Sequence, residues 1–539
     1  MAPQKLRATR HLTVLSYAVM LGIAGCGSPR SAGLDSDGGA SDSGGSDNGS
    51  SGGEDDRPHR DAAVPGHDAA LPGVDAPVPG HDAAPPGVDA PPPGVDAAPP
   101  PIDAPPPPPV PPPSGLFPLG VSSDGTTLLT NGGQPFLLQG EAAWSLIAQL
   151  STSDATRYLA DRHGRGINAL LVNLIEHFYS DHPPSDAAGD APFTTAGDFS
   201  TPNERYFAHA DQVIDLAAGQ GMAVMLFPAY LGFQVQEGWR TEMTAMGSVS
   251  GAPKCASYGR FLGQRYASKH NILWMWGGDD TPTQEPAVEA CLKAIRDGIV
   301  AAEPGALTSA HWAPNSTSRS EPNFNGSIKL VGVYDYSTSL STTCRSARTA
   351  ANSPRMPTYM LETCYEGELI QGCSGDAAEA RRRQFWGWLG CGAGQIYGIG
   401  GMWQFSAGWA NKLGSPATVS AQRLLAIAQQ VAWNTLAPDD ALVTAGAAAG
   451  TIAARTADNR QAVIYLAPTI PPPASPINTA PITVNLGRLA GAVTATWQDP
   501  TASRSIAAGS GLTGSHVFTP PQGGNGAGNQ DWVLVLTAP

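Results

Sequence analysis

The sequence predicts an α/β fold, a (β/α)8 barrel of the TIM type, followed by a small antiparallel β-sandwich and preceded by a disordered tether. Three observations carry this prediction. Strand-like apolar runs alternate with helical patterns between residues 136 and 398, a period of two replaces them after Asp439, and 23 of the 50 prolines lie before Ser114. A segment so rich in proline cannot bury enough apolar surface to form a core.

The N-terminus has the pattern of an export signal. Basic residues precede an apolar stretch, 12–24, that is too short to span a bilayer. The stretch runs into Ile23-Ala24-Gly25-Cys26, which resembles the bacterial lipobox, where small residues precede a cysteine that is lipidated. We expect residues 1–25 to be a lipoprotein signal peptide and Cys26 to anchor an exported lipoprotein at the outer membrane or cell surface. An ordinary signal peptide with an incidental cysteine is the alternative.

Residues 26–114 have the composition of a tether. Gly, Ser and Asp dominate its first part, and a seven-residue repeat then places aspartates at 68, 75, 82, 89, 96 and 103. A heptad can indicate a coiled coil, but the proline in each repeat excludes a helix. Proline and like charges together favour an extended, polyproline-like spacer.

The segment 115–436 is expected to form the barrel. Its apolar runs are typical of buried parallel strands and lie at 136–138, 167–174, 222–227, 272–276, 306–310, 328–333, 357–361 and 395–398. Helical patterns separate them, at 154–165, 203–218, 258–269, 286–302 and 377–389. Such repeats indicate a (β/α)8 barrel. A doubly wound open sheet is the alternative, but it would carry a Gly-rich phosphate loop after its first strand, and none follows Leu138.

The segment 437–539 is expected to form a β-sandwich. Short strand patterns at 462–466, 482–486, 493–497 and 532–536 are separated by Gly, Pro and Asn turns. The segment contains no cluster of His, Glu or Cys. We therefore expect an accessory domain without an active site.

The cysteines beyond Cys26 predict disulfide bonds. There are six of them, Cys255, Cys291, Cys344, Cys364, Cys373 and Cys391, and an even number in an exported protein favours three disulfides. Sequence does not choose among the 15 possible pairings. Cys255–Cys291 is the best single pair because the two residues flank the fourth strand on neighbouring helices, and Cys364–Cys373 could close one loop. A zinc site is the alternative, but the chain has no CxxC pair, so we expect no metal.

Composition excludes one class of partner. The net charge is −15, and no basic patch is present for nucleic acid. No cofactor motif stands out, and the HExxH pattern of metalloproteases is absent. A formal Gly-x-Ser-x-Gly match lies at 49–53, in the tether, where no strand–turn–helix can form around it. We expect a monomer without a cofactor.

Carboxylates and aromatic side chains follow the predicted barrel strands. Reactive groups of such barrels lie at the C-terminal ends of the strands. The carboxylates and one histidine there are Glu141, Glu176, His177, Asp279, Asp280, Asp335, Glu362 and Glu366; the aromatics are Trp144, Trp276, Trp312, Tyr336, Tyr365 and Trp403. Paired carboxylates with aromatic platforms are typical of glycoside hydrolysis. Any one of these carboxylates could instead be a structural salt bridge or loop cap.

Four motifs add a family resemblance. GEAAWSL at 140–146, NILWMWGGD at 271–279, LETCYE at 361–366 and YGIGGMWQ at 397–404 are similar to the apiosidase-like family, also called domain of unknown function 4038, which includes glycoside hydrolase family 140. Arg382 fits the same pattern. The tail, with TWQDP at 496–500 and DWVLV at 531–535, resembles the collagen-binding β-domain that often follows this family. That label alone implies no collagen affinity.

The resemblance implies a barrel that hydrolyses glycosidic bonds with an Asp after strand 4 and a Glu after strand 7. Asp279 is then the general acid/base and Glu362 the nucleophile of a retaining glycosidase, with Glu366 as the rival nucleophile. Two positions depart from the family pattern. Glu141 stands where Asp is usual, and Asp280 stands where a basic residue is usual.

The remaining residues at the strand ends are expected to bind the carbohydrate substrate. They are Glu141, Trp144, Glu176, His177, Trp276, Asp280, Asp335, Tyr365, Tyr397 and Trp403. The sequence thus predicts a surface-anchored glycoside hydrolase acting on an extracellular polysaccharide or oligosaccharide. A surface lipoprotein that binds glycans without cleaving them is the alternative.

Overall fold

The computed structural model describes residues 113–349, 353–370, 372–467 and 480–539. The chain divides into two units, Met1–Ala98 and Pro99–Pro539, and every described residue belongs to the second. The predicted signal peptide, Cys26 and nearly all of the predicted tether lie outside the described residues. Lipid anchoring therefore stays a prediction.

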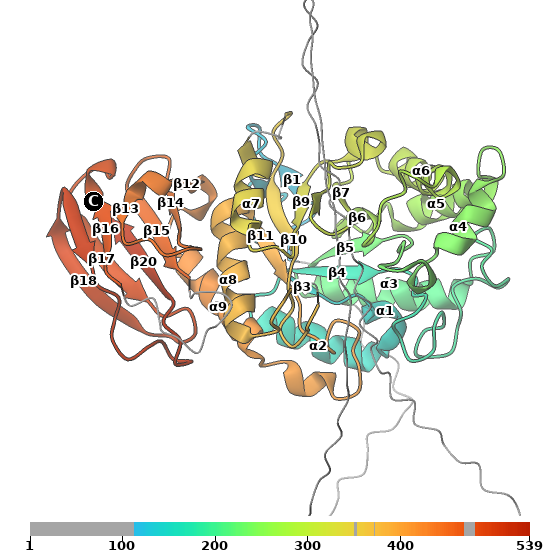
Figure 1. The fold of residues 1–539 in the computed structure, drawn as a ribbon. Coiled ribbons are helices and arrows are strands. Elements are labelled where there is room, and N and C mark those ends of the chain that lie inside the picture. The colour runs from blue at the N-terminus through green and yellow to red at the C-terminus, as the bar shows by residue number, and fades with distance from the viewer. Residues whose placement is uncertain (1–112, 350–352, 371, 468–479) are drawn as a thin grey trace, which may run out of the picture. The chain divides into compact units, whose positions relative to one another are not determined.

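A nine-stranded sheet forms the centre of the fold, in the order β7-β6-β5-β4-β3-β11-β10-β9-β8 (Figure 1). Eight of its strands run parallel, and each overlaps or directly follows one of the eight predicted apolar runs. They are β3 (Leu138–Ala142), β4 (Ala169–Asn173), β5 (Ala223–Phe227), β6 (Ile272–Gly277), β7 (Thr308–His311), β9 (Val331–Tyr334), β10 (Thr358–Glu362) and β11 (Gly392–Tyr397). The predicted barrel is confirmed.

The side chain of Ser318 helps to join β7 and β9 across the barrel. These two strands do not pair directly, and the short β8 (Ser316–Thr317) runs antiparallel to β9 beside them. The hydroxyl of Ser318 donates to the carbonyl of Ala310 on β7 (2.7 Å) and accepts the N–H of Gly332 on β9 (2.8 Å). Together with the backbone hydrogen bonds from Lys329 and Leu330 to Thr308, Ser318 thus joins the two strands.

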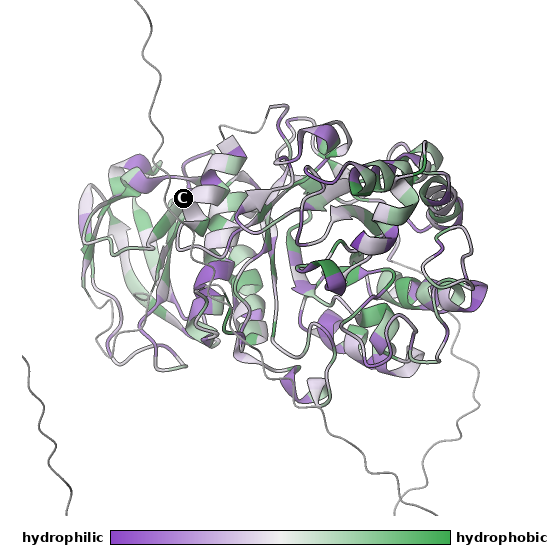
Figure 2. Ribbon diagram, turned by 45° about the vertical axis from the view of Figure 1, so that its right-hand side comes forward, coloured by the Kyte–Doolittle hydropathy of each residue, from purple (hydrophilic) through white to green (hydrophobic). Residues whose placement is uncertain are grey.

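Helices surround the sheet, and those of the predicted ranges are all present. The helices are α1 (Leu146–Gln149), α2 (Thr152–Gly164), α3 (Glu204–Gly219), α4 (Arg240–Gly247), α5 (Pro253–Tyr266), α6 (Pro286–Ala302), α7 (Leu340–Thr349), α8 (Ala377–Trp386) and α9 (Pro416–Ala428). Their colours alternate between hydrophobic and hydrophilic along their length (Figure 2), as amphipathic helices require. Sequence analysis missed α7, because its Ser, Thr and Cys residues have low helix propensity.

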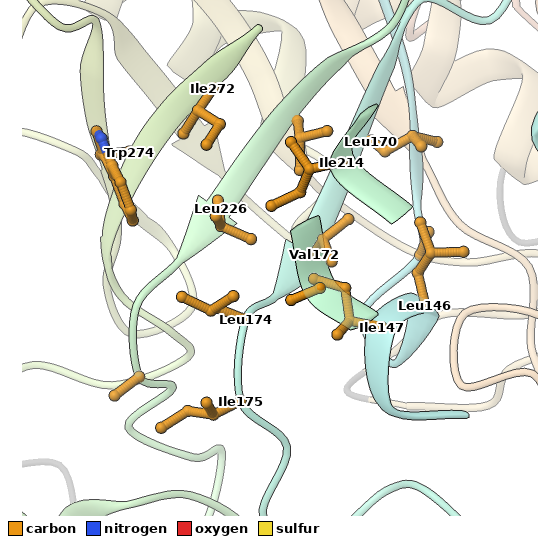
Figure 3. Close-up of a cluster of buried hydrophobic side chains, with 14 of the residues drawn as sticks. Leu146, Ile147, Leu170, Val172, Leu174, Ile175, Ile214, Leu226, Ile272 and Trp274 are labelled. Atoms are coloured by element: carbon orange, nitrogen blue, oxygen red, sulfur yellow. The ribbon is translucent and has the colours of Figure 1, made fainter. Parts of the chain in front are cut away.

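Alternate residues of each strand face opposite sides of the sheet, and both sides are apolar. Leu170 and Val172 of β4, with Leu226 of β5, pack against Ile214 of α3 in the layer between sheet and helices (Figure 3). The residues between them, such as Leu171, belong to a second cluster that fills the barrel interior. A side chain at the end of a strand therefore faces either the barrel interior or the helices, depending on whether its position is odd or even along that strand.

The C-terminal segment is entirely antiparallel, as predicted. Six strands form one sheet in the order β12-β14-β15-β20-β17-β18, and three form another in the order β13-β16-β19. Their bounds are β12 (Ala437–Pro438), β13 (Val443–Ala445), β14 (Ile452–Arg455), β15 (Gln461–Leu466), β16 (Ile482–Asn485), β17 (Val493–Gln498), β18 (Ser505–Leu512), β19 (Ser515–Phe518) and β20 (Trp532–Thr537). A further two-stranded ribbon, β1 (Gly120–Val121) with β2 (Leu128–Leu129), precedes the barrel.

Three disulfide bonds join the six cysteines of the described chain. Cys255–Cys291 connects α5 to α6, as predicted, and Cys364–Cys373 closes the loop after β10. Cys344–Cys391 connects α7 to the residues before β11. Within the described residues, no helix combines the length and the apolar character that crossing a membrane would require.

Candidate active site

Two carboxyl groups converge at the C-terminal end of the barrel. Asp279 lies two residues beyond β6, and Glu362 is the last residue of β10. One oxygen of each carboxylate and one ring nitrogen of His311 all lie within 4.8 Å of one another. Solvent reaches only 11% of the Asp279 side chain and 6% of the Glu362 side chain. The two residues predicted to be catalytic therefore share one confined site.

His311, the last residue of β7, connects the two acidic residues. The backbone N–H of Asp279 donates to His311 Nδ1 (2.9 Å), so the hydrogen of a neutral ring lies on Nε2 and is donated to Glu362 Oε2 (2.7 Å). The imidazole stacks on the ring of Tyr334, with centroids 4.3 Å apart, and meets the edge of Trp144 at 5.5 Å. His311 thus fixes Glu362 relative to the backbone that carries Asp279.

Three tyrosine hydroxyls complete the hydrogen bonding of the pair. Tyr230 donates to Asp279 Oδ2 (2.5 Å), and Tyr334 donates to Oδ1 (2.6 Å). Tyr336 donates to Glu362 Oε1 (3.1 Å), and the hydroxyls of Tyr334 and Tyr336 are 3.0 Å apart. Burial, together with the charges of the two carboxylates, raises the pKa of all three phenols well above the usual range, so they remain donors.

The electrostatic environment of Glu362 opposes its ionisation. Burial raises its pKa above the ordinary value of 4.5, and the negative charge of Asp279 raises it further. The hydrogen bond from His311 acts in the opposite direction but does not cancel these effects. A carboxyl group with a raised pKa in a confined site is characteristic of a catalytic centre.

The turn before Asp279 allows Tyr230 to come close to the Asp279 carboxylate. Gly277, Gly278 and Asp279 have φ angles of 87°, 110° and 59°, in the region that favours glycine. A Cβ on Gly278 would lie 2.2 Å from Cδ2 of Tyr230. The glycine pair therefore allows the phenol ring to lie against the turn and reach the Asp279 carboxylate.

Predicted aromatic residues line the same region. Trp144 donates its indole N–H to the hydroxyl of Tyr365 (3.2 Å), and the carboxylate of Glu362 acts electrostatically on Tyr365. Trp403 is half-buried and packs against the edge of Tyr179, with ring centroids 4.9 Å apart. Its indole N–H donates to Glu368, a carboxylate that sequence analysis did not select. Trp144, Tyr365 and Trp403 thus belong to one aromatic wall.

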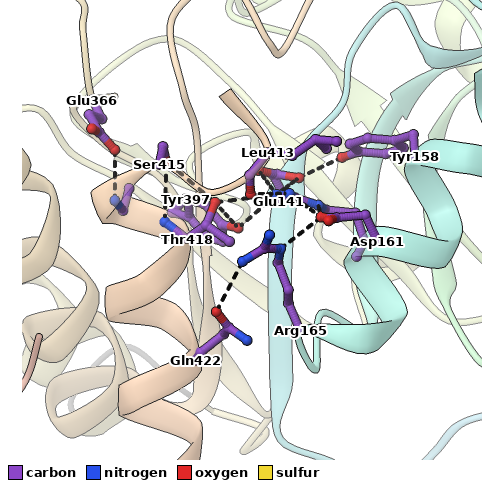
Figure 4. A network of polar contacts seen from close by, with 12 residues as sticks. Glu141, Tyr158, Asp161, Arg165, Glu366, Tyr397, Leu413, Ser415, Thr418 and Gln422 are labelled. Carbon is purple, nitrogen blue, oxygen red and sulfur yellow. Dashed lines mark hydrogen bonds and ion pairs between the residues drawn. The ribbon is translucent and has the colours of Figure 1, made fainter. Parts of the chain in front are cut away.

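Glu141 and Tyr397 are not placed to bind substrate, which corrects the prediction for both. Glu141 is fully buried, pairs with Arg162 of α2 (2.9 Å) and accepts the hydroxyl of Tyr158 (2.6 Å) (Figure 4). The hydroxyl of Tyr397 belongs to the same network through Thr418 (3.3 Å). Leu138 and Ala142 face the barrel interior, so Glu141 faces the helices. This network attaches α2 and α9 to the barrel.

Glu366 lies apart from the catalytic pair. Its Oε2 accepts the N–H of Ala417 in the first turn of α9 (2.7 Å) (Figure 4), where a carboxylate stabilises the positive end of the helix. The structure thus gives the rival nucleophile a structural role.

Three further predicted contacts are structural. Glu176 accepts the hydroxyl of Ser145 (2.7 Å) and three consecutive backbone N–H groups that begin at His177. Asp335 accepts the N–H of Ser337 and the hydroxyl of Thr343, both at 2.6 Å. The side chain of Trp276 is buried between sheet and helices, as is that of Trp312. These residues shape the loops and the core, and the prediction that Glu176, Asp335 and Trp276 contact sugar is corrected.

Asp280 and His177 lie on the rim. Asp280 forms an ion pair with Arg240 of α4. The resemblance implies a basic residue at position 280, and in this chain Arg240 brings a positive charge next to that position from another helix. His177 contacts Glu242 (3.4 Å) and lines a cavity of about 580 Å³ together with Trp239 and Phe193. Contact of either residue with the substrate stays a prediction.

Sequence analysis missed His311, Tyr230 and Tyr334. His311 directly follows the predicted strand run 306–310, and the observed strand β7 includes it. Tyr334 likewise ends β9, whose predicted run stopped at Val333. Because each predicted strand ended one residue early, neither His311 nor Tyr334 was considered as a site residue. Tyr230 lies in a loop, where no periodic sequence pattern indicates the direction of a side chain.

Among the described residues, the one cluster with the side chains and spacing to hold a metal ion consists of Asp279, His311 and Glu362. Both oxygens of Asp279 accept phenol hydroxyls, and both ring nitrogens of His311 have hydrogen-bond partners within the protein. A cation would have to displace these hydrogen bonds. The arrangement suits a carboxylate pair better than a metal centre.

Comparison with known proteins decides the family. The family model described as "Apiosidase-like, catalytic domain" matches residues 122–451. The chain belongs to the apiosidase-like family. It is a glycoside hydrolase, and residues 122–451 are referred to below as the apiosidase-like domain.

Solved structures support the fold of the apiosidase-like domain. A structure described as a glycoside hydrolase has a TM-score of 0.64 at 20% identity, covering 79% of this chain and 97% of its own. A glycoside hydrolase family 5 structure from Bacteroides vulgatus has a TM-score of 0.65 at 19% identity, covering 78% and 95%. No curated protein matches the chain. At these identities, the likeness concerns the fold.

Proposed function

We propose that the apiosidase-like domain cleaves a glycosidic bond in an extracellular polysaccharide or oligosaccharide by a retaining mechanism. The observation that carries this proposal is the convergence of Asp279 and Glu362, whose nearest oxygens lie within 4.8 Å. Retaining enzymes place the two carboxyl groups about 5–5.5 Å apart, whereas inverting enzymes need about 6.5–9.5 Å for a water molecule. The short separation favours retention.

Glu362 acts as the nucleophile in this proposal. It lies at a strand end, where the backbone is rigid, and His311 and Tyr336 each donate a hydrogen bond to one of its oxygens. These donors orient the carboxylate toward the anomeric carbon and favour its ionised form. One carboxylate oxygen then attacks the anomeric carbon, the glycosidic bond breaks and the leaving oxygen takes a proton from Asp279, which gives a glycosyl-enzyme that water later hydrolyses.

Asp279 acts as the general acid in the first step and the general base in the second. The role requires that Asp279 gain and lose a proton during turnover. Tyr334 is suited to this change because its hydroxyl lies within hydrogen-bond distance of both Asp279 (2.6 Å) and the hydroxyl of Tyr336 (3.0 Å). It can donate to Asp279 when the carboxylate is ionised and turn toward Tyr336 when the carboxyl group is protonated.

The aromatic wall supports a carbohydrate substrate. Flat faces of Trp and Tyr pack against the apolar C–H faces of sugars. Trp144 contacts His311, Tyr365 lies in the field of the Glu362 carboxylate, and Trp403 packs against the same cluster. Their positions favour binding of the sugar unit whose bond is cleaved. Anchoring through Cys26 would place this site outside the cell.

A screen of glycans by reducing-sugar release tests the proposal. The full chain and its Asp279→Ala variant are compared on plant, bacterial and host glycans. We expect release by the wild type, and a loss of several orders of magnitude in kcat for Asp279→Ala on unactivated substrates. Binding of a glycan without any release by the wild type would favour the non-catalytic alternative instead.

An activated substrate separates the two roles. With an aryl glycoside whose leaving group needs no protonation, Asp279→Ala should still form the glycosyl-enzyme. Azide should restore its turnover, because this anion attacks the glycosyl-enzyme in place of water without a general base. Glu362→Ala should be inactive on the same substrate without azide, and any product formed with azide should have inverted configuration, because azide then takes the place of the nucleophile. Rescue of Glu362→Ala with the glycoside retaining its configuration would contradict the assignment of the nucleophile.

A further inference from the structure

A second cavity lies at the opposite end of the barrel from the catalytic pair. Its volume is about 310 Å³, and its lining includes Thr358 at the start of β10 and Cys391 just before β11. Glu362 ends the same strand β10, four residues later, which corresponds to about 13 Å along an extended chain. The cavity also includes Ala437 and Pro438 of β12, so both the barrel and the C-terminal sheet contribute to it.

The charged side chains that line this cavity are all arginines. Arg345 and Arg348 come from α7, and Arg355 follows it in the chain. Arg345 pairs with Asp440. Arg348 and Arg355 form no ion pair in the part of the chain that the structure describes, and the neighbouring residues 350–352, which lie outside that part, are Ala, Ala and Asn.

Arg348 is held in place without a counter-charge. Its guanidinium lies against Gly392, where a Cβ would come within 2.7 Å of Cζ, and its Nη2 donates to the carbonyl of Leu436. Its Nη1 is buried and has no hydrogen-bond partner among the described residues. Burial and the charge of Arg355 both lower the pKa of Arg348.

Asp124, an acidic residue near the cavity, already forms hydrogen bonds within its own turn. Asp124 belongs to the turn that contributes Thr126 to the lining, but its carboxylate accepts hydrogen bonds from Ser122 (2.5 Å) and Thr126 (2.8 Å) within that turn. An unpaired, half-buried guanidinium next to a second one is unfavourable unless an anion joins them. In a protein with a net charge of −15, such a concentration of positive charge is selective for small anions that reach it.

We propose that this cavity binds an oxyanion between Arg348 and Arg355. The planar guanidinium groups match the oxygens of a sulfate, phosphate or carboxylate. The volume also admits a single acidic sugar unit, so the anion can be free or part of a glycan. The site is separate from the catalytic pair and does not depend on its function.

Isothermal titration of the full chain tests the site, with sodium sulfate, sodium glucuronate and neutral glucose as probes at constant ionic strength. We expect sulfate or glucuronate to bind the wild type and glucose not to bind. Arg348→Gln and Arg355→Gln should each weaken the binding about tenfold or more, because each removes charge-assisted hydrogen bonds. Arg260→Gln, which changes an exposed arginine on α5, should bind like the wild type.

The probes distinguish the source of the anion. Binding of sulfate alone assigns the site to inorganic oxyanions, whereas tighter binding of glucuronate assigns it to an acidic sugar. Asp279→Ala should bind either probe like the wild type, since the cavity lies away from the catalytic site. Equal affinities in the wild type, Arg348→Gln and Arg355→Gln, or no binding of either anion, would overturn the proposal. Arg355 is exposed, so its variant remains informative even if Arg348→Gln does not fold.

Discussion

The chemistry of the site depends on a few residues whose partners are known. His311 accepts a hydrogen bond from the backbone of Asp279 and donates one to Glu362, and the phenols of Tyr230 and Tyr334 hold the Asp279 carboxylate. Each contact fixes either the position or the protonation of a carboxyl group.

The acidic limb of the pH profile should report Glu362. A nucleophilic carboxyl group must be ionised, and the pKa of Glu362 is raised by burial and by Asp279. Activity should therefore be lost as the pH falls through a value above the ordinary 4.5. His311→Ala removes a hydrogen bond that lowers this pKa, so the acidic limb of kcat/KM should move to higher pH. A limb that stays in place would show that His311 does not act on Glu362.

Gly278→Ala should impair catalysis through Tyr230. The added Cβ would lie 2.2 Å from the phenol ring, and the φ of 110° disfavours any side chain. Displacement of the ring and turn should lower kcat by about 100-fold. Gly251→Ala is the matched control, because that glycine also has a positive φ of 75° but has nothing within 4 Å of an added Cβ. Equal activities of the two variants would argue against the role of the turn.

At the scale of helices and strands, position along the chain was predictable and side-chain direction was not. The apolar runs located all eight parallel strands, and with them Asp279 and Glu362 at the strand ends. They did not reveal that Glu141 faces the helices, because that depends on the register of β3 within the closed sheet. His311 was missed because the predicted strand ended one residue early.

Glu141→Gln should destabilise the fold without a specific effect on substrate binding. Glu141 and Arg162 form a buried ion pair between β3 and α2, and neutralising Glu141 leaves the buried Arg162 with the partly exposed Asp161 as its counter-charge. We expect a loss of about 3–5 kcal/mol in the free energy of unfolding, measured by urea denaturation. KM at a temperature where the variant is folded should be unchanged. A raised KM at an unchanged free energy of unfolding would instead indicate that Glu141 binds substrate.

At the scale of the whole molecule, the apiosidase-like barrel and the C-terminal sheet share a core. Phe385 of α8 stacks on Tyr465 of β15 with ring centroids 4.5 Å apart, and Arg381 pairs with the buried Asp531 (2.6 Å). Sequence analysis predicted a change of architecture near residue 437 but could not show that the two parts pack together. Long-range contacts of this kind leave no periodic pattern in either segment.

Attachment to the membrane is predicted to depend on one thiol. Cys26→Ser removes the acceptor of the lipid in the lipobox-like Ile23-Ala24-Gly25-Cys26, so the variant should leave the membrane fraction and should not incorporate labelled fatty acid. Cys364→Ser, which changes a disulfide cysteine of the barrel, controls for the loss of a cysteine and should still be labelled. Labelling of Cys26→Ser would contradict the lipobox interpretation.

The central claim is that Glu362, and not Glu366, completes the catalytic pair with Asp279. The most direct measurement is kcat/KM of Glu362→Ala and Glu366→Ala in one assay on the first glycan found to be cleaved, with folding checked by circular dichroism. Since the carboxylate of Glu366 accepts a hydrogen bond from the first turn of α9, we predict that its variant stays within about tenfold of the wild type and that Glu362→Ala loses about 10⁴-fold or more. An inactive Glu366→Ala beside an active Glu362→Ala would contradict the account.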